Sequence, residues 1–275
     1  MKKFERMLLA CDMDGTLLDS QRKVSVKNQQ AIQYFTEQGG LFSLATGRAP
    51  GAAQPYFDEL SINAPYSLLN GALIFDKQHN ILSCAGMPEK TKELINAAVS
   101  KFPEIGCEIF DSENIYIRQM SEVTETHLKT LNLSYQPIMQ DELTDTSSWC
   151  KINLTGTPKI LGLVRAFLQP YADEFCMASS MPMFLEITEK SVHKGAALQK
   201  IAAYCGIPNN RIYAIGDSFN DEMMLRMAYK GFAPQNADQG ILEIADIVVR
   251  NHDCDAVAAA IEWLDNMETR PGRTK

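Results

Sequence analysis

The sequence lacks the residue patterns of a zinc site or of a disulfide framework. Its seven cysteines are scattered, odd in number and without a CxxC pair, so we interpret them as reduced thiols. His79, His127 and His252 show no metal-ligand spacing. Neither a structural zinc nor a disulfide-stapled fold is therefore expected.

Positive charge and long apolar runs are also scarce. The 26 Lys and Arg residues stand against 34 Asp and Glu, which gives a net charge of −8 and argues against binding to nucleic acid or an anionic membrane. No stretch approaches the ~18 apolar residues of a membrane span, and residues 1–10 lack the apolar core of a signal peptide. We expect a cytoplasmic protein, a monomer or weak homo-oligomer, with no nucleic acid and no membrane as partner.

The sequence does contain an alternation of short apolar runs and helical patterns in its first and last thirds. Strands are predicted over residues 7–11 and 41–45, on either side of a helix over 27–38. The last third repeats this pattern, with helices over 194–205, 221–228 and 255–266 and strands over 211–215 and 247–250. This rhythm is typical of an α/β fold with a Rossmann-like parallel sheet.

The middle of the chain has a different character. Its predicted helices cover residues 89–101, 123–131 and 159–171, and its predicted strands cover 108–111, 115–119, 151–155, the vicinity of 175, and 184–188. Such a mixture indicates an α+β module inserted into the α/β one, in keeping with a length of 275 residues. The predicted domains are a core over 1–84 and 184–275 and an insertion over 85–183.

The sharpest motif is DMDGTL at residues 12–17, directly after the first predicted strand. Ligands of open parallel sheets bind beyond the carboxyl ends of the strands. Asp12 and Asp14 bring two negative charges close together there. A bound cation or a shared proton would reduce the repulsion between them. Asp and Gly also favour ordinary turns, but five specified positions would occur by chance in fewer than roughly one in 10³ chains of this length. The pattern therefore favours a functional site.

Three further motifs follow in order: ATGR at residues 45–48, KG at 194–195 and GDSFND at 216–221. With these four motifs the sequence resembles the haloacid dehalogenase superfamily, and within it the Cof-like phosphatases with a type IIB cap. The resemblance covers nearly the whole chain. It implies a Rossmann-like core with an inserted α+β cap, and a phosphatase that acts on small phosphorylated metabolites such as sugar phosphates.

The resemblance also implies catalytic roles. Asp12 would attack phosphorus to form an aspartyl phosphate, and Asp14 would protonate the leaving oxygen and later activate water. Asp14 favours phosphoryl transfer, because a dehalogenase relative lacks it. Lys194 would pair with Asp12 and the phosphoryl oxygens. Independently, a lysine that opens a helix is unfavourable against the helix dipole unless an anion lies nearby.

The binding residues that the resemblance implies lie in the same motifs. The predicted phosphate ligands are Met13, Thr46, Gly47, Lys194 and Asn220. The predicted Mg²⁺ ligands are Asp12, Asp14 through its backbone carbonyl, and Asp217, a hard oxygen set that suits this ion. Arg48, Asn70 and Asp221 are further candidates for substrate contact or for support of the metal ligands. Without the family context, a strand-ending turn and helix caps would explain several of these residues equally well.

Some assignments stay open at this point. Specificity is expected to lie in the insertion, where Arg118 and Lys151 are candidates but are equally interpretable as solvated charges. His193 departs from the small polar residue usual in relatives, and we expect it to be structural. A phosphomutase of the same superfamily and a catalytically weak sugar-phosphate sensor are the alternative functions.

Overall fold

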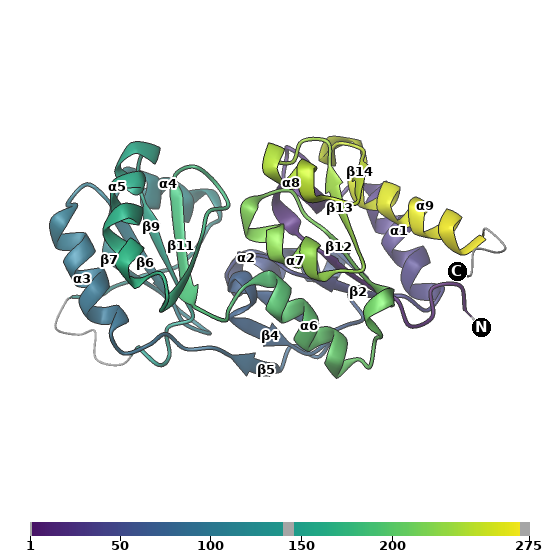
Figure 1. Cartoon of the computed structure of the whole chain (residues 1–275), viewed down its shortest axis with the longest axis horizontal. Coiled ribbons are helices and arrows are strands. Elements are labelled where there is room, and N and C mark those ends of the chain that lie inside the picture. Colours follow the sequence, from purple (N-terminus) through teal and green to yellow (C-terminus); the bar gives the residue numbers. More distant parts are fainter. Residues whose placement is uncertain (1, 140–145, 270–275) are drawn as a thin grey trace.

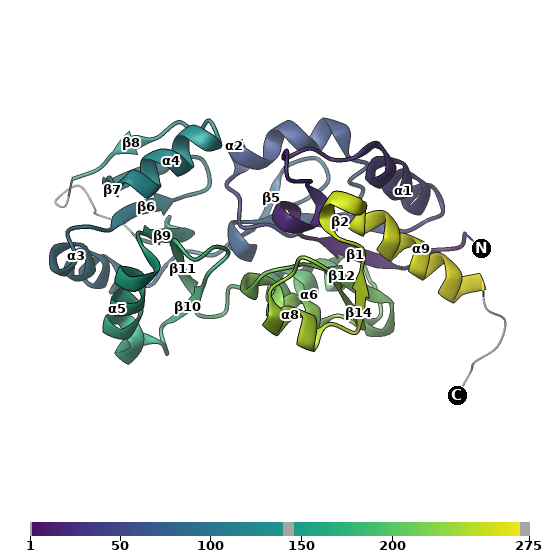
Figure 2. The same cartoon turned by 90° about the horizontal axis from the view of Figure 1, so that it is seen from above.

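The computed structural model describes residues 2–139 and 146–269. Two bodies lie side by side in both views, the first carrying α1, α6, α7, α8 and α9 and the second carrying α3, α4 and α5 (Figures 1 and 2). Within the described ranges, no helix is long and apolar enough to cross a lipid bilayer.

A five-stranded parallel sheet in the order β14-β13-β12-β1-β2 forms the centre of the first body, which we call the core. The strands are β1 (Leu8–Cys11), β2 (Leu41–Leu44), β12 (Ile212–Ile215), β13 (Lys230–Pro234) and β14 (Ile247–Val249). The helices are α1 (Val26–Glu37), α6 (Lys194–Tyr204), α7 (Glu222–Met227), α8 (Gln239–Ile244) and α9 (Ala256–Thr269). The predicted α/β class is confirmed.

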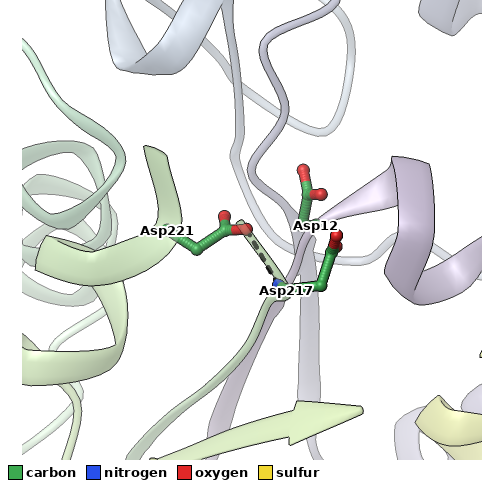
Figure 3. A group of neighbouring side chains, drawn as sticks. All are labelled: Asp12, Asp217 and Asp221. Atoms are coloured by element: carbon green, nitrogen blue, oxygen red, sulfur yellow. Dashed lines mark hydrogen bonds between the residues drawn. The ribbon is translucent and has the colours of Figure 1, made fainter. Parts of the chain in front are cut away.

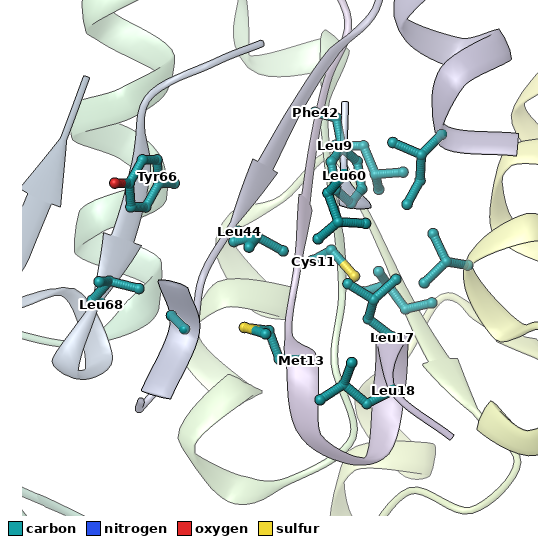
Figure 4. Close-up of a cluster of buried hydrophobic side chains, with 14 of the residues drawn as sticks. Leu9, Cys11, Met13, Leu17, Leu18, Phe42, Leu44, Leu60, Tyr66 and Leu68 are labelled. Atoms are coloured by element: carbon teal, nitrogen blue, oxygen red, sulfur yellow. The ribbon is translucent and has the colours of Figure 1, made fainter. Parts of the chain in front are cut away.

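The two faces of this sheet are covered by different helices because successive strand residues point to opposite sides. In β1, Leu9 and Cys11 belong to the apolar cluster that contains residues of α1 and α9 (Figure 4). Leu8 and Ala10 instead join the cluster that contains residues of α6, α7 and α8. All four residues of β1 are buried, so the strand that carries Asp12 at its end is fixed from both faces.

A small antiparallel sheet extends the core toward the second body. It consists of β3 (Tyr66–Leu68), β4 (Leu73–Phe75) and β5 (Ile81–Cys84). A parallel bridge between Ala45 and Ser67 attaches it to the end of β2. The short helix α2 (Pro50–Ala53) lies between β2 and β3 in the sequence.

A six-stranded sheet in the order β10-β11-β9-β6-β7-β8 forms the second body, which we call the cap. Its strands are β6 (Gly106–Phe110), β7 (Ile115–Gln119), β8 (Gln136–Pro137), β9 (Lys151–Thr155), β10 (Phe175–Ala178) and β11 (Phe184–Glu189), and its helices are α3 (Thr91–Lys101), α4 (Glu122–Thr130) and α5 (Pro158–Leu168). One face of the sheet packs with α3 and α5 around residues such as Ile109, Ile152 and Ile187. Because side chains alternate, the intervening residues face the other way.

The strand β11 begins directly after residue 183, the predicted end of the cap. β11 pairs with β9 and β10 and is therefore part of the cap sheet. We propose that the cap runs to the end of β11, at Glu189, and that the core resumes before α6.

Candidate active site

The turn after β1 places Asp12 beside the end of β12. The backbone N–H of Asp12 donates to the carbonyl of Ile215, 3.0 Å away. Gly15 then has a positive φ of 76°, and a Cβ atom there would lie 2.4 Å from a carboxylate oxygen of Asp217. The hydroxyl of Thr16 donates to that carboxylate at 2.5 Å. The glycine and threonine of the first motif thus allow Asp217 to approach Asp12.

Three carboxylates meet at this point. Asp12, Asp217 and Asp221 each offer an oxygen, and these oxygens lie within 4.8 Å of one another (Figure 3). The backbone N–H groups of Asp217 and Ser218 donate to Oδ2 of Asp221 at 3.0 and 3.1 Å. The loop after β12 therefore holds Asp221 next to Asp217. The cluster thus contains Asp12 and Asp217, which the sequence predicted as metal ligands, and also Asp221.

Lys194 provides the cation of the cluster. Its Nζ atom lies 2.6 Å from Oδ1 of Asp12 and 2.7 Å from Oδ1 of Asp221, and the side chain is fully buried. Burial alone would lower the pKa of Lys194, but the two carboxylates outweigh this effect and raise the pKa. The anions that the start of α6 requires are therefore present in the protein itself.

One lysine does not offset the negative charge of three carboxylates, of which Asp12 and Asp221 are buried and Asp217 is half-buried. Burial, together with the charge of Asp221, raises the pKa of Asp12 well above its usual range and raises the pKa of Asp217 to about 7. A second cation would relieve this crowding. The converging donors are oxygens only, so the cluster fits a hard divalent ion better than a soft one.

The Asp14 side chain does not join this cluster. Both of its oxygens accept hydrogen bonds from the Arg48 guanidinium, at 2.7 Å each. Burial would lower the pKa of Arg48, but Asp14 overcomes this effect and raises it. The Asp14 side chain remains 56% exposed, whereas that of Arg48 is buried. The predicted metal contact through Asp14 concerns its backbone carbonyl, which this ion pair does not involve.

The loop after β2 brings the second motif to the same edge of the core. Thr46 is buried, and its carbonyl accepts from the backbone N–H of Asn70 at 3.0 Å. The Nδ2 group of Asn220 donates to Oδ1 of Asn70 at 3.2 Å. A Cβ atom on Gly47 would lie 2.8 Å from that same oxygen, so only glycine leaves Asn70 in this position.

The cap covers this edge and encloses a cavity of about 580 Å³. The predicted residues that line it include Asp12, Asp14, Thr46, Gly47, Arg48, Asp217 and Asn220. Nζ of Lys151 in β9 donates to the carbonyl of Gly47 at 3.0 Å, and Asn70 donates to the Glu186 carboxylate of β11. The cap therefore touches the loop that is predicted to bind phosphate.

Other predicted residues have different places. Arg118 does not line the cavity; its Nε donates to Asn96 at 3.3 Å. His193 caps α6, because its Nδ1 accepts from the backbone N–H of Ala196 at 3.1 Å. Burial lowers the pKa of His193 and so favours the neutral ring that can accept this bond. The expected structural role of His193 agrees with this contact.

Of the polar cap residues that line the cavity, the sequence named Lys151 as a candidate but missed others. His127, Asn153 and Glu186 also line the cavity. Asn153 and Glu186 lie on cap strands, between the apolar residues that face α3 and α5. That alternation marks their face of the sheet but gives no motif. Finding them required knowing that this face is turned toward the core.

Comparison with known proteins agrees with the fold. The chain matches the family model of haloacid dehalogenase-like hydrolases over residues 9–261. YxeH of Bacillus subtilis (strain 168) is 31% identical over 268 residues, covering 94% of this chain and 97% of that protein. Phosphatase YwpJ of the same organism is 27% identical over 282 residues, covering 94% and 99%. The structure of the subclass IIB sugar phosphatase BT4131 superposes with a TM-score of 0.83 at 22% identity, covering 94% of this chain and 98% of that one.

A parallel core sheet, a cap sheet and an acidic cluster at the strand ends define a hydrolase of this architecture. The chain belongs to the haloacid dehalogenase-like hydrolase family, in its Cof-like group. It is a phosphatase, and its substrates are small phosphate esters.

Proposed function

We propose that the enzyme hydrolyses small phosphomonoesters, including sugar phosphates, with Asp12 as nucleophile and Mg²⁺ as cofactor. One observation carries the proposal: the buried Asp12 carboxylate lines the cavity while Lys194 contacts it at 2.6 Å. A carboxylate held beside a buried cation is positioned to meet a phosphoryl group without free rotation.

The chemistry takes two steps. An oxygen of Asp12 attacks phosphorus, the bond from phosphorus to the leaving oxygen breaks, and that oxygen receives a proton. Water then attacks the phosphorus of the aspartyl phosphate, the bond to Asp12 breaks, and inorganic phosphate leaves. Lys194 offsets the charge of the phosphoryl oxygens in both steps. The phosphate contacts proposed for the remaining oxygens are Met13, Thr46, Gly47 and Asn220.

Asp14 is the proposed general acid and base. It would deliver the proton to the leaving oxygen and then take one from the attacking water. To do so it must leave the two hydrogen bonds with Arg48, and its exposed side chain has room to rotate. Arg48 is then a positioning residue that holds Asp14 at the cavity between turnovers.

Asp12, Asp217 and the backbone carbonyl of Asp14 would hold Mg²⁺. When bound, the ion neutralises charge on the phosphoryl oxygens and orients the group. Asp221 would keep Asp217 in place through the backbone N–H of Asp217. The predictions of a cytoplasmic location and of a monomer or weak homo-oligomer stay predictions.

Purified protein incubated with Mg²⁺ and p-nitrophenyl phosphate, with no acceptor alcohol, tests these points. We expect inorganic phosphate to appear, to disappear on addition of EDTA and to return with Mg²⁺. Asp12→Asn should lower the rate on the order of 10⁴-fold or more, while Asp58→Asn, at an exposed aspartate outside the cavity, should not. Wild-type activity in Asp12→Asn would refute the mechanism. A phosphomutase would need a phosphorylated acceptor, and a sensor would bind esters without turnover.

A further inference from the structure

Two cysteines lie on either side of the point where the chain passes from the core into the cap. Cys84 ends β5, where it pairs with Leu73 of β4, so it belongs to the core. Cys150 comes directly before β9, and its backbone N–H donates to the carbonyl of Phe110 in β6 at 2.7 Å, so it belongs to the cap. From β5 the chain runs straight into the cap (Figure 1). The two residues therefore belong to different bodies.

Their thiols are nevertheless in contact. The two Sγ atoms lie 3.4 Å apart, although the residues are 66 positions apart in the sequence. Both are free thiols. A disulfide bond holds its sulfurs about 2 Å apart, so the remaining approach of roughly 1.4 Å can be covered by a change in side-chain torsion.

The connection beside Cys84 is short and is held at both ends. The backbone N–H of Ala85 donates to the core carbonyl of Ala72 at 2.9 Å. The backbone N–H of Met87 donates at 3.2 Å to the carbonyl of Thr146, in the segment before β9. Only Gly86 separates these two anchors. A change in the angle between core and cap must therefore be absorbed around Gly86 and at the second crossing, after β11.

The two cysteines differ in access to solvent. Cys84 is exposed and Cys150 is buried, so a soluble disulfide such as oxidised glutathione reaches Cys84 first. The Cys84 thiolate attacks one sulfur of that disulfide, the disulfide bond breaks, and one glutathione leaves as a thiolate. The thiol of Cys150 then loses its proton, and its sulfur attacks that of Cys84 and displaces the second glutathione.

The net reaction is balanced and reversible. Two protein thiols lose two electrons and two protons, and one glutathione disulfide is reduced to two thiols. Burial and the neighbouring Cys84 raise the pKa of Cys150, which slows the second step at neutral pH because the thiolate is the nucleophile. Since Cys84 is exposed, a reductant can reach the resulting bond, and exposed disulfides are the labile ones.

We propose that Cys84 and Cys150 form a reversible disulfide between core and cap, and that this bond slows the enzyme by limiting movement of the cap. The effect on rate rests on the proposed phosphatase function. The cavity is lined by both bodies, and Lys151, next to Cys150, donates to the carbonyl of Gly47 on the core. The disulfide adds a third covalent connection beside this contact. Entry of the ester and release of phosphate both require the cavity to open.

Oxidised glutathione added to the purified full chain tests the proposal. We expect mass spectrometry of alkylated peptides to find a crosslink between Cys84 and Cys150. With p-nitrophenyl phosphate and Mg²⁺, kcat should fall about 5- to 10-fold in the crosslinked protein and recover with dithiothreitol. Cys84→Ser should form no crosslink and keep its rate under the oxidant. Cys254→Ser, at another exposed cysteine, should behave like the wild type.

Cys150→Ala provides a second variant, which should stop at the glutathione adduct on Cys84 because the second sulfur is missing. A wild-type adduct on Cys84 that never becomes the crosslink would overturn the proposal. An active crosslinked protein with unchanged kcat would do the same, as would inhibition that persists in Cys84→Ser.

Hydrogen exchange at residues 85–87 separates this proposal from the proposed function. The crosslink should slow exchange there, because it limits movement between the two anchors. Slower exchange in the crosslinked form, with no hydrolysis by either form, would support the tether and refute only the proposed function.

Discussion

The two walls of the cavity are built from different chemistry. On the core wall, Asp12, Asp221 and Lys194 form contacts of 2.6 and 2.7 Å between full charges. On the cap wall, neutral side chains such as Asn153, Phe110 and Met183 line the cavity beside the ion pair of Lys151 and Glu186. The difference separates two tasks, because a phosphoryl group always carries charge while the rest of the ester need not. The core can thus stay constant while the cap changes.

Among the variants that compare the two walls, Lys194→Met should give the largest effect. It leaves Asp12 and Asp221 without their buried cation, which should reduce the free energy of unfolding by about 3–5 kcal/mol and kcat/KM about 10³-fold. Urea unfolding and phosphate release measure the two quantities. Lys200→Met, at an exposed position of the same helix, is the control. If Lys194→Met kept normal activity, the charged wall would not be the catalytic one.

Lys151→Met removes the buried cation of the cap and tests whether the two walls are equivalent. Because Glu186 would lose its 3.2 Å partner, we expect unfolding to become easier by about 3 kcal/mol. The rate should fall only about 10-fold, since Lys151 contacts the loop after β2 only through the carbonyl of Gly47. Lys129→Met is the matched control, because its ion pair with Glu125 is exposed and should leave unfolding unchanged. If Lys151→Met lost as much activity as Lys194→Met, the two walls would not differ in their contribution to catalysis.

Gly47→Ala should have the smallest effect and probes the contact between the walls. The added Cβ atom would lie 2.8 Å from Oδ1 of Asn70 and 3.4 Å from Nζ of Lys151. We expect KM to rise about 5-fold and stability to fall by about 1 kcal/mol through overpacking. At Gly51 the nearest atom to an added Cβ would lie 3.9 Å away. Gly51→Ala should therefore leave KM and the thermal unfolding temperature unchanged.

The charged wall could be predicted because its residues follow strands. Asp12 comes after β1, Thr46 after β2 and Asp217 after β12, and the ends of neighbouring parallel strands meet at one edge. The pairing of Asp14 with Arg48 and of Lys194 with Asp221 could not be read from the motifs, because side-chain direction within a loop depends on tertiary packing.

Apart from Lys151, the residues of the cap wall could not be predicted, for a different reason. Glu108 and Asn153 are polar residues within strands, which by themselves indicate a solvated face. Only the position of the cap over the core makes that face an inner one. Among the strands of the core sheet, β13 was missed because it contains Gly231 and Pro234, residues that usually interrupt strands.

The insertion also sets the order in which the chain can fold. Every strand of the cap sheet lies between Gly106 and Glu189, so that sheet is complete as soon as Glu189 has emerged from the ribosome. β1 is synthesised first, but it pairs with β12. Leu8 therefore cannot pair with Ile212 until β12 has been made. Contacts between residues so distant in sequence form late. During synthesis β1 therefore lacks its neighbour β12 while the cap folds, and its apolar residues need protection until β12 has been made.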